Sequence, residues 1–153
     1  MVNRNRYPTQ WPTPEQFEGL AFAAGIIAGE GCVNSGSRPT ADGRREIHFS
    51  VMMQCHESVE AVARALSPYM PTAGQFTLGV NVAYQKHNKD GIQYARIHIT
   101  GSKAQVAVRV LWPWLKRTDK AGQALEAFDR AGLTWPHDWK VSPQVPIDLA
   151  SVS

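Results

Sequence analysis

The chain has 153 residues, of which 43% are hydrophobic and 19% are charged. This length suits one compact domain with its own core, and the balance argues against a largely disordered chain. The net charge of +3 suits a polyanionic partner but is also common among ordinary soluble proteins. Cys32 and Cys55 lack the spacing of a zinc site and are too few for a disulfide framework, which indicates a reducing, cytoplasmic setting.

One apolar segment, between Glu18 and Glu30, resembles a membrane span. It holds only 11 residues, whereas a helix needs ~20 to cross a bilayer. It also has the wrong flanks for a signal peptide. We therefore expect an intracellular protein with no membrane partner.

The first 12 residues are polar, basic and broken by proline, and we interpret them as an N-terminal arm. The first helix is predicted over residues 14–28. Thr13 can cap it, Pro14 suits its first position, and Gln16 completes a capping box. One apolar stripe at helical spacing is expected to face the core: Phe17, Leu20, Ala21, Ala24, Ile27 and Ala28.

A second face of the same helix has very small side chains. Ala21, Gly25 and Gly29 recur every four residues, with Phe22 and Ile26 beside them. Such a face lets another helix backbone approach closely, so we interpret it as a dimer interface. A helix that is wholly buried within a monomer is the alternative.

Further along the chain, alternating and helical patterns follow one another. After the first helix, a small and polar stretch at 32–38 leads through an Asp42-Gly43 turn signal into a strand at 44–54. Further strands are predicted at 75–85 and 93–100, and helices at 56–66, 102–112 and 119–131. Pro113 is expected to end the third helix and Gly132 the fourth. The order of helix, two strands, helix, two strands and helices predicts an α+β domain over 13–132, followed by a tail over 133–153. Its antiparallel sheet would be covered by helices on one face.

The other face of that sheet would carry side chains that reach base edges and phosphates in a DNA groove. An ordinary solvated face is the alternative interpretation. The side chains are Arg44, His48, Gln54, Gln75, Thr77, Asn81, Gln85, Arg96 and His98.

The stretch AAGIIAGEG at 23–31 resembles the motif of the LAGLIDADG homing endonucleases, and the order of elements resembles their fold. The resemblance implies an αββαββα saddle in which two motif helices pack around a twofold axis. It also implies that Gly25 and Gly29 are helix contacts and that Glu30 binds divalent metal. A carboxylate at the negative end of a helix indicates a cation beside it in any case. One motif per chain implies a homodimer.

Other positions match the family less closely. Ala28 stands where the motif often has a second acid, and Ala23 where it often has leucine. The resemblance suggests that Gln54 holds metal-bound water and that Lys120, in a K-x-x-Q spacing, is the basic residue that offsets charge at the cleaved phosphodiester, with Lys116 as its rival. Gln54 and Lys120 are equally well explained as ordinary surface residues, and for Lys116 that explanation is the better one.

Taken together, these features predict a site-specific double-strand DNA endonuclease of mobile-intron or phage origin. It would act as a homodimer on double-stranded DNA, with Mg²⁺, for which Mn²⁺ can substitute, and with no small-molecule cofactor. The alternative is a non-cutting protein of the same fold, either a DNA-binding regulator or an RNA-splicing maturase.

Overall fold

The computed structural model describes residues 13–39, 41–70, 72–73, 76–77, 79–87 and 89–133. The predicted arm and all of the predicted tail except Leu133 lie outside these residues. The helices are α1 (Pro14–Glu30), α2 (His56–Leu66), α3 (Gly101–Leu115) and α4 (Lys120–Arg130), with a 3₁₀ helix η1 at Ser67–Tyr69. The strands are β1 (Gly31–Pro39), β2 (Arg45–Met53), β3 (Thr72–Ala73), β4 (Phe76–Thr77), β5 (Ala83–Lys86) and β6 (Gln93–Thr100).

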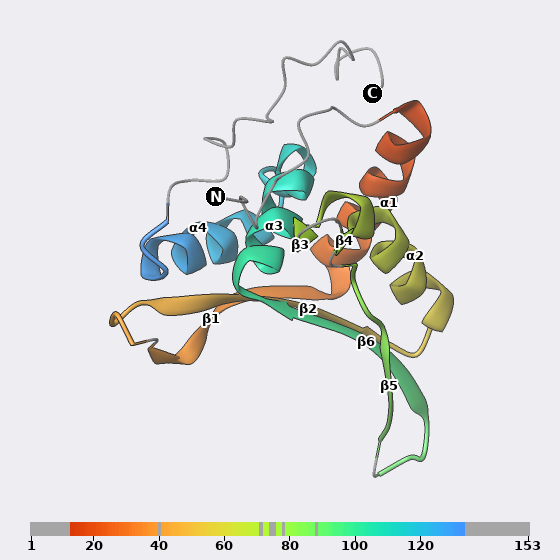
Figure 1. The fold of residues 1–153 in the computed structure, drawn as a ribbon. Helices are drawn as coiled ribbons and strands as arrows, with labels where there is room; N and C mark the ends of the chain where they lie inside the picture. The colour runs from red at the N-terminus through yellow and green to blue at the C-terminus, as the bar shows by residue number, and fades with distance from the viewer. Residues whose placement is uncertain are drawn as a thin grey trace.

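Four strands form one antiparallel sheet in the order β1-β2-β6-β5, and β3 pairs with β4 separately. The four helices lie on one side of the larger sheet, which curves beneath them (Figure 1). The predicted α+β fold, with helices on one face of a four-stranded antiparallel sheet, is therefore confirmed. None of the helices among the described residues has the length and apolar character that crossing a membrane requires.

The alternation of side chains in the strands decides which face of the sheet is buried. Val33, Phe49 and Ile99 lie side by side on β1, β2 and β6, and all three are buried under the helices. Val51 and Ile97 form a second buried pair in the same layer. Because successive side chains point to opposite faces, the residues between them must point away from the helices. The sheet therefore has an open face.

Helix α1 begins as its sequence predicts. Thr13 accepts a hydrogen bond from the amide of Gln16, and the Gln16 side chain accepts one from the amide of Thr13 at 2.9 Å. The core stripe differs in part from the prediction, because Ala23 is buried whereas Ala21 and Ala28 are only half-buried.

The prediction of one continuous strand over 75–85 is wrong. Only Ala83–Lys86 joins the four-stranded sheet, and Phe76–Thr77 pairs with Thr72–Ala73 instead. Between them, the Ser67 Oγ accepts a hydrogen bond from the Val80 amide at 2.9 Å, and the Lys103 ammonium donates to the Gly79 carbonyl at 2.8 Å. The backbone of 79–80 therefore bonds to side chains of the helical layer and not to a neighbouring strand.

The prediction that Pro113 ends the third helix is also wrong. Proline removes one backbone hydrogen bond, here that to the Arg109 carbonyl. The helix nevertheless continues to Leu115, which is fully buried, and the Lys116 amide donates to the Trp112 carbonyl at 3.0 Å. Burial of the last turn outweighs the loss of the bond.

Helix α4 ends just before Gly132, as the sequence predicts. Gly132 has φ +69°, a left-handed conformation that glycine adopts without steric cost. Its amide donates to the Asp129 carbonyl at 3.0 Å, and the Leu133 amide donates to the Phe128 carbonyl at 2.9 Å. This pair of hydrogen bonds is the Schellman motif that closes many helices.

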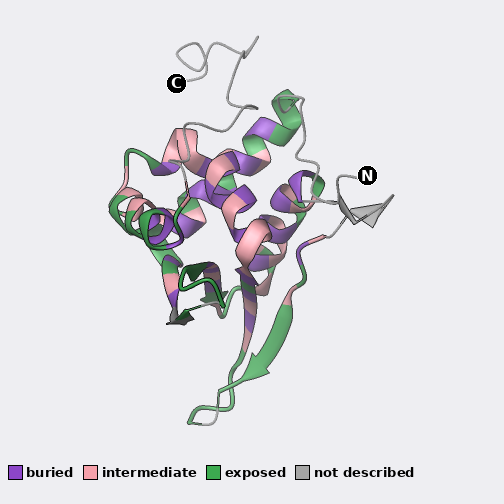
Figure 2. Ribbon diagram, turned by 60° about the vertical axis from the view of Figure 1, so that its left-hand side comes forward, coloured by how far each residue is buried: buried purple, intermediate pink, exposed green. Residues whose placement is uncertain are grey.

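The β5–β6 hairpin extends away from the helices, and all four β5 residues are exposed (Figures 1 and 2). His56, the first residue of α2, contacts both strands of this hairpin. The His56 Nε2 donates to the Gln93 carbonyl at 2.8 Å, and its ring centroid lies 5.3 Å from that of Tyr84. These contacts fix the hairpin against the helical layer.

The junction between α1 and β1 leaves no space for a larger residue at Gly31. A Cβ atom there would lie 2.8 Å from the Cα and Cγ2 atoms of Ile27. We predict that Gly31→Ala lowers the free energy of unfolding by about 1–3 kcal/mol, because overpacking forces the backbone to move. Gly122→Ala, at an exposed helical glycine with open space around it, should be neutral or should stabilise by up to ~1 kcal/mol. Urea unfolding followed by circular dichroism measures both, and equal stability of the two variants would contradict this account of the junction.

Candidate nucleic-acid interface and metal site

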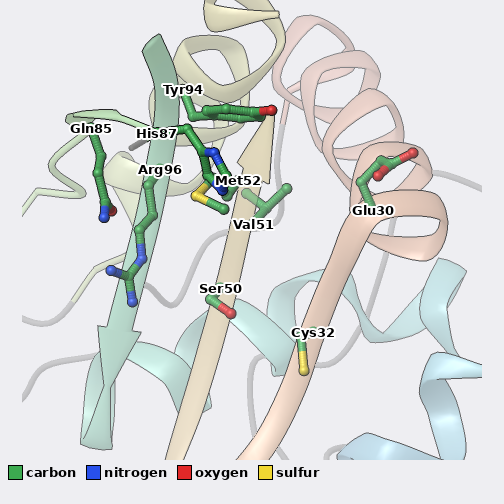
Figure 3. Close-up of a pocket in the computed structure, with 9 residues that line it drawn as sticks. All are labelled: Glu30, Cys32, Ser50, Val51, Met52, Gln85, His87, Tyr94 and Arg96. Atoms are coloured by element: carbon green, nitrogen blue, oxygen red, sulfur yellow. The ribbon is translucent and has the colours of Figure 1, made fainter. Parts of the chain in front are cut away.

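A cleft of about 530 Å³ lies between the end of α1 and the open face of the sheet. Figure 3 shows Glu30 on one side of it, with Arg96 on β6 and Gln85 on β5 across from it. The described residues that line the cleft are Glu30, Cys32, Ser50, Val51, Met52, Gln85, His87, Tyr94 and Arg96. The cleft thus joins the predicted metal-binding acid to the predicted DNA-binding face.

Glu30 is the last residue of α1, and its side chain is exposed. The last turn of this helix carries no basic residue, and Glu30 takes part in none of the ion pairs found among the described residues. The carbonyl end of a helix is negative, so the carboxylate adds to a potential that is already negative. This position favours a bound cation.

Gln54 contacts the cleft through a hydrogen bond to Tyr94. Its Nε2 donates to the hydroxyl oxygen of Tyr94 at 3.2 Å, and Tyr94 lines the cleft opposite the end of α1. Gln54 is itself exposed just after β2. The structure therefore places Gln54 at the rim of the cleft that contains Glu30.

Three predicted DNA-binding side chains form a connected group on the open face. The Arg96 Nη2 lies 3.0 Å from the His98 Nδ1, and the His98 Nε2 lies 3.1 Å from the His48 Nδ1. The pKa of His98 is lowered, first because the ring is partly removed from water and then because Arg96 and His48 are close to it. Neutral imidazole is therefore favoured at His98.

The other residues predicted on this face are placed differently. Gln85 is exposed on β5, opposite Tyr94, and Asn81 is exposed before β5 begins. Arg44 lies before β2 and beside the end of α4, where its Nε would be 3.0 Å from a Cβ atom on Gly132. Gln75 lies outside the described residues, and the Thr77 side chain is not described although its backbone belongs to β4.

Comparison with solved structures identifies the fold. The homing endonuclease I-CvuI, bound to the I-CreI target in 2 mM Mg with its DNA not cleaved, matches with a TM-score of 0.50 and 18% identity over 75% of this chain and 67% of that one. I-CvuI bound to its own target in 2 mM Ca matches at 0.48 and 19% identity, over 74% and 65% of the two chains. The group I intron-encoded homing endonuclease I-CeuI, complexed with DNA, matches at 0.41 and 14% identity, over 82% and 54%. We take the fold from the first of these.

This chain has the LAGLIDADG homing endonuclease fold. No protein-family model matches its sequence, and no curated protein matches it either. The family resemblance predicted from the first helix is thereby confirmed for the fold. At 18% identity, the comparison shows the fold alone.

Within this LAGLIDADG fold, one face of α1 is uncovered. Gly25 and Gly29 are exposed, Ala21 is half-buried, and Phe22 is 49% exposed. A Cβ atom added to Gly25 or Gly29 would meet nothing within 4 Å. The three small residues predicted as the dimer interface therefore border open space in the single chain.

The two candidate lysines lie apart from the cleft lining. Lys120 is half-buried as the first residue of α4, where its amide donates to the Thr118 Oγ1 at 3.2 Å, and Lys116 is exposed after α3. Gln123, the second member of the K-x-x-Q spacing, accepts a hydrogen bond from the Val33 amide at 3.3 Å. Of the described residues that line the cleft, none is a lysine.

The direction of α4 nevertheless puts Lys120 near the end of β1 that follows Glu30. Gln123 lies beside Val33 in the first half of β1, whereas Gly132 lies beside Arg44 at the far end of that strand. The helix therefore runs in the same direction as β1, as Figure 1 shows. Lys120, one turn before Gln123, lies toward the end of β1 that follows Glu30.

Sequence reasoning missed several residues of the cleft. Cys32, Ser50, Met52 and Tyr94 lie on the open face, where the pairings of Cys32 with Ser50 and of Met52 with Arg96 bring them together. The alternation along β6 already put Tyr94 on the polar face, but an aromatic residue gave no reason to select it. Only the pairing with β2 reveals that it meets Gln54.

A divalent cation in this fold would need more ligands than one described chain offers. Among the described residues, no three His, Cys, Asp or Glu side chains gather closely enough to hold a metal ion. Glu30 does offer the hard oxygen ligand that Mg²⁺ prefers, at a negative helix end and without a basic neighbour in its last turn. The chain thus fits a cation that a second carboxylate or a phosphate helps to bind.

Proposed function

We propose that this protein is a homodimeric, Mg²⁺-dependent, site-specific DNA endonuclease of the LAGLIDADG type. The observation that carries the proposal is the position of Glu30, an exposed carboxylate at the negative end of α1 and on the wall of the cleft. The chain has the fold of the homing endonuclease I-CvuI, whose structure was determined in complex with DNA. A target of double-stranded DNA across the open sheet face follows from this proposal.

The uncovered face of α1 supports the homodimer. Small residues at Ala21, Gly25 and Gly29 allow two helix backbones to approach closely, and the exposed Phe22 offers apolar surface beside them. Two copies packed along this face would bring their two Glu30 residues toward each other. Carboxylates in that arrangement repel one another unless a cation lies between them.

Glu30 would hold Mg²⁺ or Mn²⁺ together with its symmetry mate and the DNA phosphate. Bound metal of this kind activates water and stabilises the leaving oxygen in phosphodiester cleavage. In this proposal Gln54 orients water at the rim of the cleft, since its amide already bonds to Tyr94 there. Lys120, near the start of β1, would offset negative charge as the phosphate reacts.

A second candidate function is a non-cutting binder of the same fold, acting as a DNA-binding regulator or an RNA-splicing maturase. One observation favours it. The described lining of the cleft contains a single carboxylate and no lysine, so this chain alone does not assemble a catalytic set. Metal-dependent cleavage by the dimer decides between the two functions.

For the dimer, we predict that Gly25→Leu produces monomers. A leucine side chain fits the single chain, because nothing lies within 4 Å of a Cβ atom at Gly25, but it would separate two close-packed helices. Gly122→Leu is the matched control, since Gly122 is also an exposed helical glycine with open space. Multi-angle light scattering measures the mass of each. A monomeric wild type, or a dimeric Gly25→Leu, would contradict the α1 interface.

For cleavage, we predict that Glu30→Gln lowers the rate by roughly a thousandfold or more while DNA binding survives. Glutamine keeps the size of the side chain but loses the charge that binds metal, and bound metal contributes several kcal/mol in such sites. Glu18→Gln, an exposed acid near the other end of α1, should cut normally. The measurement is linearisation of plasmids carrying host DNA fragments, with Mg²⁺, with Ca²⁺ and with chelator. Wild type that binds a fragment tightly yet never cuts it with Mg²⁺ or Mn²⁺ would establish the non-cutting binder.

For DNA binding, we predict a steep fall in affinity with salt. Each phosphate neutralised by a basic side chain releases counterions and contributes about −0.9 to the slope of log K against log salt concentration. Fluorescence anisotropy with the selected duplex, between low and high salt, gives the slope. A slope near zero would show that the open face does not bind DNA through its phosphates.

A further inference from the structure

Arg96, His98 and His48 make a directional chain of hydrogen bonds across β6 and β2. In the sheet, His48 pairs with Thr100, Ser50 with His98 and Met52 with Arg96, so the three side chains all lie on the open face. Their contacts, 3.0 Å and then 3.1 Å, connect Arg96 to His98 and His98 to His48. The two imidazole centroids are 5.1 Å apart.

Arginine fixes the direction of this chain. A guanidinium has only donors, so the His98 Nδ1 must accept the bond from the Arg96 Nη2. Neutral His98 then carries its proton on Nε2 and donates it to the His48 Nδ1. His48 in turn carries its proton on its own Nε2, which lies against Gly36 of β1, where an added Cβ atom would be only 3.0 Å away. Each ring is thereby held in one tautomer and one orientation.

The lowered pKa of His98 agrees with this geometry. Partial removal of the ring from water, the charge of Arg96 and the proximity of His48 all disfavour imidazolium. A proton on the His98 Nδ1 would also break its bond to Arg96. The other titratable groups of the described face and cleft are Glu30, Cys32, Glu46, His87 and Tyr94.

The hydrogen bond to His98 leaves most of the Arg96 guanidinium available to a ligand. Its neighbours in register, Met52 and Ala83, carry no charge, and none of the ion pairs among the described residues includes Arg96. Only Nη2 is used by His98. A guanidinium that is already oriented loses less side-chain freedom when it binds than a mobile one does.

We propose that Arg96 reads a guanine in the major groove of the bound duplex, and that His98 and His48 are positioning residues that orient it. The proposal rests on the proposed DNA binding. Bidentate bonding of arginine to the O6 and N7 acceptors of guanine is the commonest specific contact in the major groove, and a two-stranded ribbon fits that groove. A fixed guanidinium on the middle of a sheet face suits this geometry.

The first test selects binding sites from a randomised duplex pool with the wild-type dimer and then with variants. Wild type should require guanine at one position, by roughly tenfold to a hundredfold over the other bases, and Arg96→Lys should relax that one position. His98→Leu, which removes the acceptor, should lower the guanine preference several-fold. His98→Asn, whose side-chain oxygen can still accept from Arg96, should retain it.

The outcomes separate this proposal from the proposed function. If Arg96→Lys weakens binding equally for all sequences, Arg96 contacts phosphate and the proposal is wrong. If sites are selected but neither Arg96 nor His98 variants alter any base preference, the proposal is again wrong while DNA binding stands. Failure of the wild type to select any duplex would overturn the proposed function itself, and the guanine contact with it.

A second test uses the free protein and needs no DNA. Imidazole nitrogen NMR should show the Nε2–H tautomer for both His98 and His48, and Arg96→Met should raise the pKa of His98 toward its ordinary value. Lowering the pH through that pKa should reduce the guanine preference while it strengthens binding to unselected duplex, because the imidazolium adds charge but no longer accepts from Arg96. An Nδ1–H tautomer at His98, or a guanine preference that does not change with pH, would show that His98 does not orient Arg96 and would overturn the proposal.

Discussion

The candidate site depends first on the direct junction between α1 and β1, which fixes where Glu30 meets the sheet. Helix α1 ends at Glu30 and β1 begins at Gly31, with no residue between them. This turn admits only a residue without a side chain, because a Cβ atom on Gly31 would be 2.8 Å from the Ile27 backbone. The carboxylate is thereby held at the rim of the sheet, at the negative end of the helix, where a hard cation is its most favourable neighbour.

The division of the sheet into two faces gives that acid its surroundings. Burial of residues such as Phe49 and Ile97 under the helices stabilises the fold, and the strand period then forces His48, Arg96 and His98 onto the opposite side. One face therefore provides stability and the other provides donors and acceptors. The cleft lies where the second face meets the end of α1, so the polar side chains of this face and the carboxylate of Glu30 line one cleft from opposite sides.

Much of the fold follows from local sequence signals. The capping box at Thr13, the helical spacing of 56–66 and Gly132 after α4 each predict an element boundary that the structure contains. The failures arise where distant contacts outweigh local preference. Ser67 and Lys103 bind the backbone of 79–80 and interrupt a well-alternating strand, and burial of Leu115 extends α3 beyond Pro113.

In the candidate site, too, contacts between distant segments could not be predicted from local sequence patterns. Glu30 could be predicted because it ends a recognisable motif, and the parity of β2 and β6 places His48, Arg96 and His98 on one face. Their hydrogen-bonded chain and the bond from Gln54 to Tyr94 depend on the register between strands, which alternation within one strand does not determine. The position of Arg44 beside Gly132 depends on where α4 packs, and no local pattern contains that information.

The proposed function requires that two chains each contribute one Glu30 to a single DNA-cutting dimer. Mixed dimers test it most directly. Wild-type and Glu30→Gln chains with different affinity tags are co-expressed, purified through both tags and incubated with Mg²⁺ and a supercoiled plasmid that carries the selected site. We expect mixed dimers to bind this site as wild type does but to fail to linearise the plasmid, leaving it intact or nicked in one strand. Linear product at the wild-type rate would contradict this proposal, because cleavage of both strands would then not need a Glu30 from each chain.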